Sequence, residues 1–184
     1  MNAELKKVRN KLRKTLPHSR MVYPERPAHL IKYHFWRVYT PLHPFVRDLA
    51  LALRIVKFES RSERFPLGTV APHSSVEKLV HYLVSRGYAY HRVAWEDNGE
   101  LVGMRRVENF LYQYHIRIYE DGEVRGHYEF TPEAYPILHL NRIGQEARRE
   151  EFLLLLKDHI IEYKPADRAQ DTQEFLRDFQ HPAS

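Results

Sequence analysis

The stretch YQYHIRIYEDGEVRGHYEF, residues 112–130, places the residue types that acid–base chemistry requires on both sides of one tight turn. Imidazole groups gain and lose protons near neutral pH, and guanidinium groups stabilise charge that develops on a phosphoryl group. The candidate catalytic residues are His115, His127, Arg117, Arg125 and Glu129. On one face of a sheet, these groups could cleave RNA, with one histidine as the general base and the other as the general acid.

The length of the turn decides which of these side chains share a face. A two-residue loop of Asp121 and Gly122 would place His115 and His127 on opposite faces and would mix polar with apolar residues on both. A three-residue loop from Glu120 to Gly122, with glycine in the left-handed conformation, separates the two kinds of residue cleanly. We therefore predict the second register, in which His115 lies directly opposite His127. The predicted core face consists of Tyr112, Tyr114, Ile116, Ile118, Val124, Tyr128 and Phe130.

Three other interpretations of the polar face stay open. It can be an ordinary solvated sheet surface on which the histidines have no role. It can bind phosphate without turnover, since Arg117 and Arg125 oppose each other and need an anion or a carboxylate between them. It can bind a transition metal through the two histidines with Glu129 or His139. The chain contains no established ligand motif such as HExxH, so we predict neither a metal nor another cofactor.

Two segments upstream have different periodicities. Residues 30–40 are rich in aromatic and β-branched residues and favour an extended segment. Residues 43–58 predict a helix, because Pro44 suits the first helical position and the apolar residues recur at helical spacing. The predicted buried stripe of this helix is Phe45, Leu49, Ala52, Leu53 and Val56.

The elements nearest the central hairpin have clearer boundaries. Residues 73–87 predict a helix that begins with a capping box of Ser74 and Glu77 and ends at Gly87. Residues 88–107 predict a hairpin around Asn98-Gly99. The expected cross-strand pairs are Trp95 with Val102 and Val93 with Met104. A long helix over about residues 145–163 is predicted to pack on the sheet.

Together these segments predict an α+β fold. N-terminal helices precede an antiparallel meander of about four strands, and the long C-terminal helix packs on one sheet face. The predicted organisation is a basic N-terminal arm and linker over residues 1–27, a single α+β domain over 28–164, and a polar C-terminal tail over 165–184.

The composition narrows the class of protein. The absence of cysteine excludes disulfides, thiolate metal sites and cysteine nucleophiles. No apolar run approaches the length of a membrane span and none follows the N-terminal lysines, so we expect a cytoplasmic protein without a membrane partner.

Positive charge is concentrated at the N-terminus. The first 40 residues carry ten lysines and arginines against two glutamates, although the whole chain has a net charge of only +5. This distribution predicts the backbone of RNA or DNA as a partner. The candidate nucleic-acid-binding residues are Lys6, Lys7, Arg9, Lys11, Arg13 and Lys14. The apolar side of the same segment, formed by Leu5, Val8 and Leu12, can alternatively dock the helix on the domain.

The central hairpin and the residues after it, HYEFTPEAYPILHL, are similar to the central block of TumE-type toxins of toxin–antitoxin systems. The residues that carry the resemblance are Tyr112, Tyr114, His115, Gly122, Tyr128, Glu129, Pro132, Pro136 and His139. The chain departs from that pattern at His127, where arginine is usual, at Phe130, which replaces asparagine, and in a histidine cluster reduced to His139. The resemblance covers about 28 residues and implies a toxin-related role that targets RNA.

Two functional hypotheses follow from these patterns. The first is a small nucleic-acid-associated protein whose hairpin face binds phosphate or cleaves RNA without a metal, as a ribonuclease does. The alternative is a non-catalytic protein-interaction module or partner subunit, in which the basic helix only docks. Whether the protein is an enzyme stays open between them.

Overall fold

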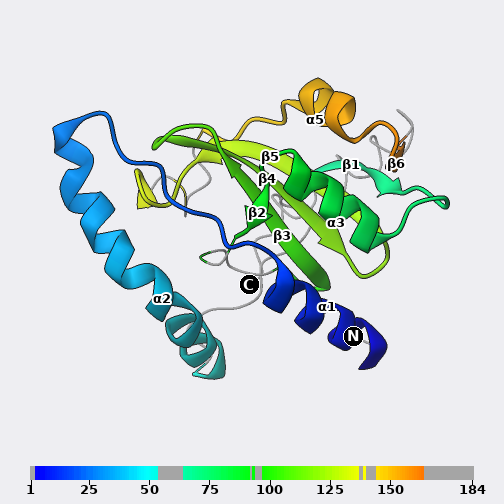
Figure 1. Ribbon diagram of the computed structural model, residues 1–184, viewed down its shortest axis with the longest axis horizontal. Coiled ribbons are helices and arrows are strands. Elements are labelled where there is room, and N and C mark those ends of the chain that lie inside the picture. Colours follow the sequence, from blue (N-terminus) through cyan, green and yellow to red (C-terminus); the bar gives the residue numbers. More distant parts are fainter. Residues whose placement is uncertain are drawn as a thin grey trace, which may run out of the picture.

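The computed structural model describes residues 3–53, 64–91, 93, 97–136, 139 and 144–163, and these form an α+β fold, as predicted (Figure 1). The elements run in the order α1 (Ala3–Thr15), the short 3-10 helix η1 (Pro27–His29), α2 (Leu30–Ala52), β1 (Phe65–Val70), α3 (Val76–Ser85), β2 (Ala89–Tyr90), β3 (Glu100–Val107), β4 (Tyr112–Tyr119), β5 (Glu123–Phe130), α5 (Arg149–Leu156) and β6 (Ile160–Glu162). No helix within these residues is both long and apolar enough to cross a membrane.

The sheet is antiparallel and has six strands in the order β2-β3-β4-β5-β1-β6. The predicted meander of about four strands is therefore too small, because β1 and β6 extend the sheet beyond β5. Pro66 and Gly68 obscure β1 in the sequence, since both residue types are unfavourable in strands. Gly68 nevertheless has a positional reason: a Cβ atom there would lie 2.1 Å from the carbonyl oxygen of Ile161 in β6.

The register of the central hairpin is the predicted one. His115 pairs with His127, Gln113 with Glu129 and Arg117 with Arg125. Gly122 has a φ of 84°, as the left-handed position of a three-residue loop requires. A slip of one residue would exchange the two faces of one strand relative to its partner, so the apolar alternation specifies this register.

Three helices cover the apolar face of the sheet. Figure 1 shows α3 lying across the strands, with α5 at one end and α1 at the other. The residues that form this core include Leu12 and Leu16 of α1, Leu79, Val80 and Leu83 of α3, Phe152 and Leu156 of α5, and Ile116, Ile118 and Val124 of the hairpin. Of the predicted core face, Tyr114, Ile116, Ile118, Val124 and Tyr128 belong to this core, Tyr112 packs against it and Phe130 is half-buried. Leu12 docks α1 on the domain, as the alternative for the basic helix predicted.

Two helix boundaries differ from the prediction. The C-terminal helix spans only eight residues and ends at Leu156, and residues 160–162 form β6 instead. The β-branched pair Ile160 and Ile161 favours that strand. Helix α3 begins one residue later than the capping box predicts, because Ser75 and not Ser74 accepts the hydrogen bond from the amide of Lys78.

Helix α2 contradicts two predictions. Residues 30–40 are helical, not extended, and the helix continues without a break through Pro41 and Pro44. Its buried side chains are Trp36 and His43, whereas the stripe predicted to be buried faces solvent. The exposed apolar side chains along α2 and its C-cap are Ile31, Phe35, Val38, Leu42, Phe45, Val46, Leu49 and Leu53. Val56 of the predicted stripe lies outside the described residues.

The β2–β3 hairpin keeps its predicted turn but has a different register. Gly99 has a φ of 74°, consistent with a turn at Asn98-Gly99. Met104, however, pairs with Tyr90, three residues before the predicted partner Val93. The connection between the strands is therefore longer than two residues. Trp95 and the predicted tail over residues 165–184 lie outside the described residues.

Candidate functional site

The polar face of the hairpin is buried. His115 and His127 are each only 1% exposed, and Glu129 is 3% exposed. The interpretation of this face as a solvated surface is therefore wrong. The other buried polar residues of this face come from the hairpin strands themselves, from β3 and from loops: Gln113, Arg117, Glu123, Arg125, Glu100, Arg105, Arg64, His91, Asp97 and Glu133. Because buried charges are costly unless they are paired, each of them needs a partner.

The two opposed arginines of the hairpin have carboxylate partners. Arg117 contacts Glu100, and its Nη1 lies 3.2 Å from Oδ1 of Asp97. Arg125 pairs with Glu123, with 2.7 Å between Nη2 and Oε1. No external phosphate is required to keep these arginines together. Asp97 and Glu100 flank the Asn98-Gly99 turn, and their role in the site has no signal in the local sequence pattern.

A further ion pair, between Arg105 and Glu133, supports the carboxylate of Glu129. Arg105 makes a two-pronged contact with Glu133, at 2.7 Å and 3.1 Å, and also donates to Oε1 of Gln113 at 3.0 Å. Gln113 in turn donates from Nε2 to Oε1 of Glu129 at 2.9 Å. Gln145 donates to the other oxygen of Glu129 at 3.1 Å. This chain of contacts holds the Glu129 carboxylate against the two histidines.

The histidines converge on one oxygen of Glu129. Nε2 of His127 lies 3.1 Å from Oε1, and Nδ1 of His115 lies 3.5 Å from the same atom. The two imidazole rings are 5.2 Å apart between centroids, and the ring of His91 lies 4.9 Å from that of His115. His139 approaches the other carboxylate oxygen, with Nδ1 at 3.4 Å from Oε2. The structure thus brings His115, His127 and Glu129 together as predicted, and adds His91, which the sequence analysis missed.

Burial controls the ionisation of this cluster. Desolvation lowers the pKa of His91 and of His115 well below the ordinary value, and nearby arginines lower both further. Desolvation also lowers the pKa of His127. Burial alone would raise the pKa of Glu129, but His127 and His139 outweigh that effect and hold it well below its usual range. At neutral pH the imidazoles of His91, His115 and His127 are therefore neutral and the carboxylate of Glu129 is ionised.

Acidification is expected to destabilise the protein below about pH 6.5, the ordinary pKa of histidine. The unfolded chain then binds protons that the buried histidines of the folded state do not, so unfolding becomes more favourable as the pH falls. Each histidine that stays neutral in the folded state contributes up to about 1.4 kcal/mol for each pH unit. Urea unfolding at pH 7.5, 6.5 and 5.5 measures this loss. His91→Gln should reduce the dependence, and a stability that does not change over this range would contradict the neutral cluster.

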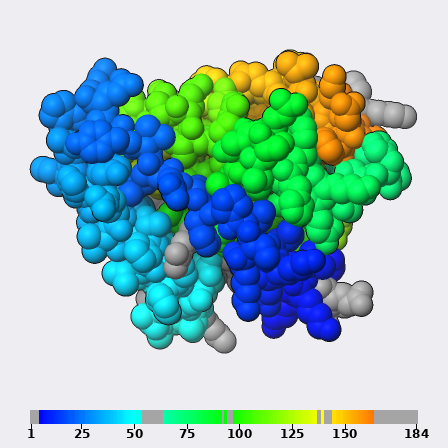
Figure 2. Space-filling model, viewed as in Figure 1, coloured from blue at the N-terminus to red at the C-terminus, as the bar shows by residue number. Residues whose placement is uncertain are grey.

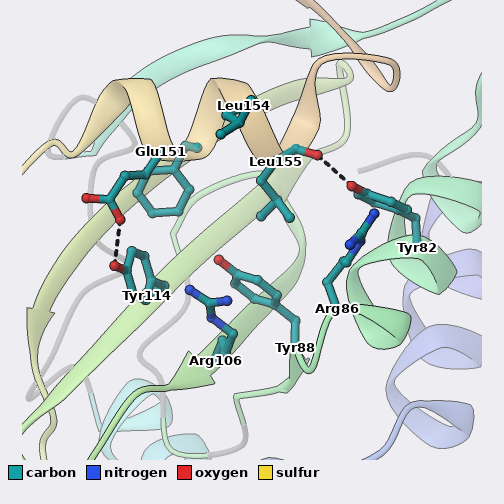
Figure 3. A pocket seen from close by; sticks show the side chains of 9 residues that line it. Tyr82, Arg86, Tyr88, Arg106, Tyr114, Glu151, Leu154 and Leu155 are labelled. Carbon is teal, nitrogen blue, oxygen red and sulfur yellow. Dashed lines mark hydrogen bonds between the residues drawn. The ribbon is translucent and has the colours of Figure 1, made fainter.

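A pocket lies on the opposite, apolar face of the sheet, between α3, α5 and strands β3 and β4 (Figure 3). It has a volume of about 280 Å³ and is lined by Tyr82, Arg86, Tyr88, Arg106, Tyr114, Glu151, Phe152, Leu154 and Leu155. The guanidinium of Arg106 lies over two rings, 5.7 Å from the centroid of Tyr88 and 4.6 Å from that of Tyr114. That of Arg86 lies 5.1 Å from the ring centroid of Tyr82. Among the described residues, neither arginine forms an ion pair.

Further arginine–tyrosine contacts extend this pocket in both directions. Arg148 lies 3.5 Å from the ring centroid of Tyr128, beyond Tyr114. On the other side, Arg13 of α1 lies 5.8 Å from the ring centroid of Tyr90. Tyr88 and Tyr90 are two residues apart and so point to the same face. We call the set Arg13, Tyr90, Tyr88, Arg106, Tyr114, Arg148 and Tyr128 the Arg–Tyr row.

The basic helix α1 adjoins this surface. Figure 2 shows the atoms of α1 next to those of α3 on the same side of the molecule. Of the predicted nucleic-acid-binding residues, Lys6, Lys7, Lys11 and Lys14 are exposed, whereas Arg9 and Arg13 are half-buried. The row and the lysines together place cations over this face, above tyrosine rings that are themselves buried.

Comparisons with known proteins give no relative from which a function could be transferred. The chain matches no protein-family model, no curated protein and no solved structure. The resemblance to TumE-type toxins accordingly stays a prediction. The function has to be argued from the buried polar face and from the Arg–Tyr row.

Proposed function

We propose that the protein binds single-stranded nucleic acid on the face formed by α1 and the Arg–Tyr row. The observation that carries the proposal is the pocket in which Arg86 and Arg106 lie against tyrosine rings without an ion pair among the described residues. A guanidinium that stacks on a ring offers its second side to a base and its N–H groups to a phosphate. The cavity of about 280 Å³ suits a group of the size of one nucleotide base.

The lysines of α1 supply the second part of the proposed surface. Single-stranded nucleic acids are bound by cationic grooves that follow the backbone and by platforms on which bases stack. Lys6, Lys7, Lys11 and Lys14 are exposed along one helix, and Arg13 connects that helix to Tyr90 of the row. Phosphates contacted by α1 would thus lie within a few nucleotides of a base held in the pocket.

The test is a titration of the protein with a fluorescent single-stranded RNA, a DNA of the same sequence and a duplex. Arg106→Ala is expected to weaken binding of the single strands about 10–100-fold, because base stacking contributes about 1–3 kcal/mol for each base. Arg106→Lys keeps the charge and should also bind weakly, since an ammonium cannot stack. Lys157→Ala removes an exposed cation that does not line the pocket and serves as the matched control. Equal binding by all four proteins would contradict the proposal.

Cleavage of RNA by the two histidines is not part of this proposal. General acid–base catalysis requires each imidazole to come within hydrogen-bond distance of the substrate. His115 and His127 are each 1% exposed, and Arg117 and Arg125 already bind carboxylates. A phosphodiester cannot reach these groups in this arrangement. The catalytic roles predicted for His115, His127, Arg117, Arg125 and Glu129 therefore lack the access that they need.

Helix α2 favours a second candidate function, self-association. Its exposed residues Ile31, Phe35, Val38, Leu42, Phe45 and Leu49 follow one another at alternating intervals of four and three residues. This spacing has the period of 3.5 that allows two helices to interlock their side chains. A second copy of the chain carries the identical stripe on a helix of the same 23-residue length. We propose that α2 pairs with α2 of another copy.

Leu42→Glu is expected to convert such a dimer into a monomer, because a carboxylate would be buried at the centre of the helix pair. Light scattering coupled to gel filtration at several protein concentrations measures the mass. Arg37→Glu, which is exposed on the same helix but off the stripe, should leave the mass unchanged. A wild-type protein that is monomeric at high concentration would contradict self-association.

A further inference from the structure

Among the described residues, Glu129 is the carboxylate of the buried polar face for which no guanidinium partner is seen. The buried arginines of this face are Arg64, Arg105, Arg117 and Arg125, and the buried carboxylates are Asp97, Glu100, Glu123, Glu129 and Glu133. Four of the carboxylates contact an arginine: Asp97, Glu100, Glu123 and Glu133. Among the described residues, the charged partners near Glu129 are only histidines. A buried carboxylate without a guanidinium partner leaves room for a cation.

We infer that His115, His127 and Glu129 bind a divalent transition-metal ion. Each offers one ligand atom, and the three atoms lie within 4.8 Å of one another. In a tetrahedral site with metal–ligand distances of about 2.1 Å, neighbouring ligand atoms are about 3.4 Å apart. The separations of 3.1 Å and 3.5 Å from Glu129 Oε1 to the two histidine nitrogens lie on either side of that value. This inference departs from the expectation from the sequence that the protein binds no metal.

Unsatisfied ring nitrogens support the inference independently. Within the described part of the chain, both ring nitrogens of His91, both of His115 and Nδ1 of His127 are buried without a hydrogen-bond partner. Buried polar atoms without partners are rare, and an ion is one of the few things that satisfies them. A neutral imidazole binds a metal through such a lone pair, and Nδ1 of His115 is the unpartnered nitrogen that faces Glu129. On His127 the nitrogen that faces Glu129 is Nε2, so Nδ1 of His127 is not the proposed ligand atom. The ring of His91 is close enough to that of His115, at 4.9 Å between centroids, for His91 to supply a fourth ligand.

The surroundings of Glu129 resemble the outer contacts that metal ligands need. Ligating carboxylates are oriented by hydrogen bonds from a second layer of residues. Gln113 and Gln145 each donate to one oxygen of Glu129, and Arg105 and Glu133 hold Gln113 in place. Two histidines and a carboxylate suit zinc, and also iron and cobalt in their divalent states. The ion would lie within the buried polar face. Its bonds to His115 of β4 and to His127 and Glu129 of β5 would join the two strands and stabilise the fold.

The first test measures metal content and stability of the whole chain. After dialysis against a chelator and then against micromolar ZnCl₂, the protein should contain one zinc per chain, and its melting temperature should rise with zinc concentration because the ion binds the folded state. Cobalt in the same site should give the intense visible absorption of a tetrahedral complex. A folded wild-type protein that takes up no zinc and shows no change in melting temperature would overturn the inference.

Variants then locate the ion. His127→Gln and Glu129→Gln should each lose the stoichiometric zinc and the zinc-dependent rise in melting temperature. His81→Gln removes an exposed histidine of α3 and should retain both. Gln113→Leu removes a hydrogen bond to Glu129 and should weaken zinc binding about 10–100-fold. One equivalent of zinc bound with wild-type affinity by Glu129→Gln would place the ion elsewhere and overturn the assignment. If a ligand variant does not fold, the stoichiometry and cobalt spectrum of the wild type still decide.

Discussion

Glu133→Ala is expected to lower the free energy of unfolding by about 3–5 kcal/mol, because it leaves the guanidinium of Arg105 buried without its carboxylate. The side chains of this pair are 1% and 3% exposed, and both oxygens of Glu133 receive a hydrogen bond from Arg105. Water cannot replace the lost partner without opening the face. Urea unfolding of parent and variant, followed by circular dichroism, measures the difference.

A matched control separates burial from the loss of an ion pair as such. Glu162→Ala breaks the pair between Glu162 and Arg149, whose side chains are 50% and 14% exposed, and should cost less than about 1 kcal/mol. The double variant Arg105→Met with Glu133→Leu removes both buried charges and should recover most of the lost stability. A cost below about 1 kcal/mol for Glu133→Ala would show that the polar face is open to water.

Reversal of the α1 charges is expected to weaken nucleic-acid binding strongly. Replacing Lys6, Lys7, Lys11 and Lys14 together by glutamate is expected to weaken binding of a single-stranded RNA about 10²–10³-fold at 0.1 M salt. Each phosphate contact on a single strand contributes about 0.7 to the dependence of log affinity on log salt, so the slope should become shallower by up to about 3. Anisotropy titrations at salt concentrations between about 0.05 and 0.2 M measure both the affinity and the slope.

Charge reversal is preferable to deletion of the helix, because Leu12 and Leu16 of α1 are part of the core. The circular dichroism spectrum of the fourfold variant should match that of the parent. Lys157→Glu, which changes an exposed lysine outside α1, should leave the salt slope unchanged. An unaltered slope in the fourfold variant would exclude α1 from the interface, and loss of binding in Arg106→Ala alone would confine recognition to the pocket.

The Arg–Tyr row and the buried polar face lie on opposite sides of the sheet. The Arg–Tyr row lies at the margin of the apolar core, where Tyr88, Tyr114 and Tyr128 are buried by the arginines and helices above them. His115, His127 and Glu129 lie on the opposite face of the same strands. Because the side chains of a strand alternate between faces, β4 contributes Tyr114 to one surface and His115 to the other. A change at one surface can therefore be made without touching the other.

Helix α2 illustrates where reasoning from residue type fails. Residues 30–40 contain β-branched and aromatic residues, and this composition predicts an extended segment. The spacing of Ile31, Phe35 and Val38 has the period of a helix, and the helix forms. The exposure of this stripe is a tertiary property, since no local pattern states whether an apolar helix face will find a partner within the same chain.

The sequence by itself determined the register of the central hairpin and the membership of its two faces. The two-residue period of a strand and the left-handed glycine at position 122 leave one arrangement that separates apolar from polar residues. Only the tertiary structure decided that the polar face is buried. Its charges are satisfied by residues distant in the chain, as Arg105 is by Glu133, 28 positions away, and such long-range pairs leave no periodic signal. For the same physical reason the convergence of His91 with His115, His127 and Glu129 emerges only when β2, β3, β4 and β5 lie side by side in the sheet.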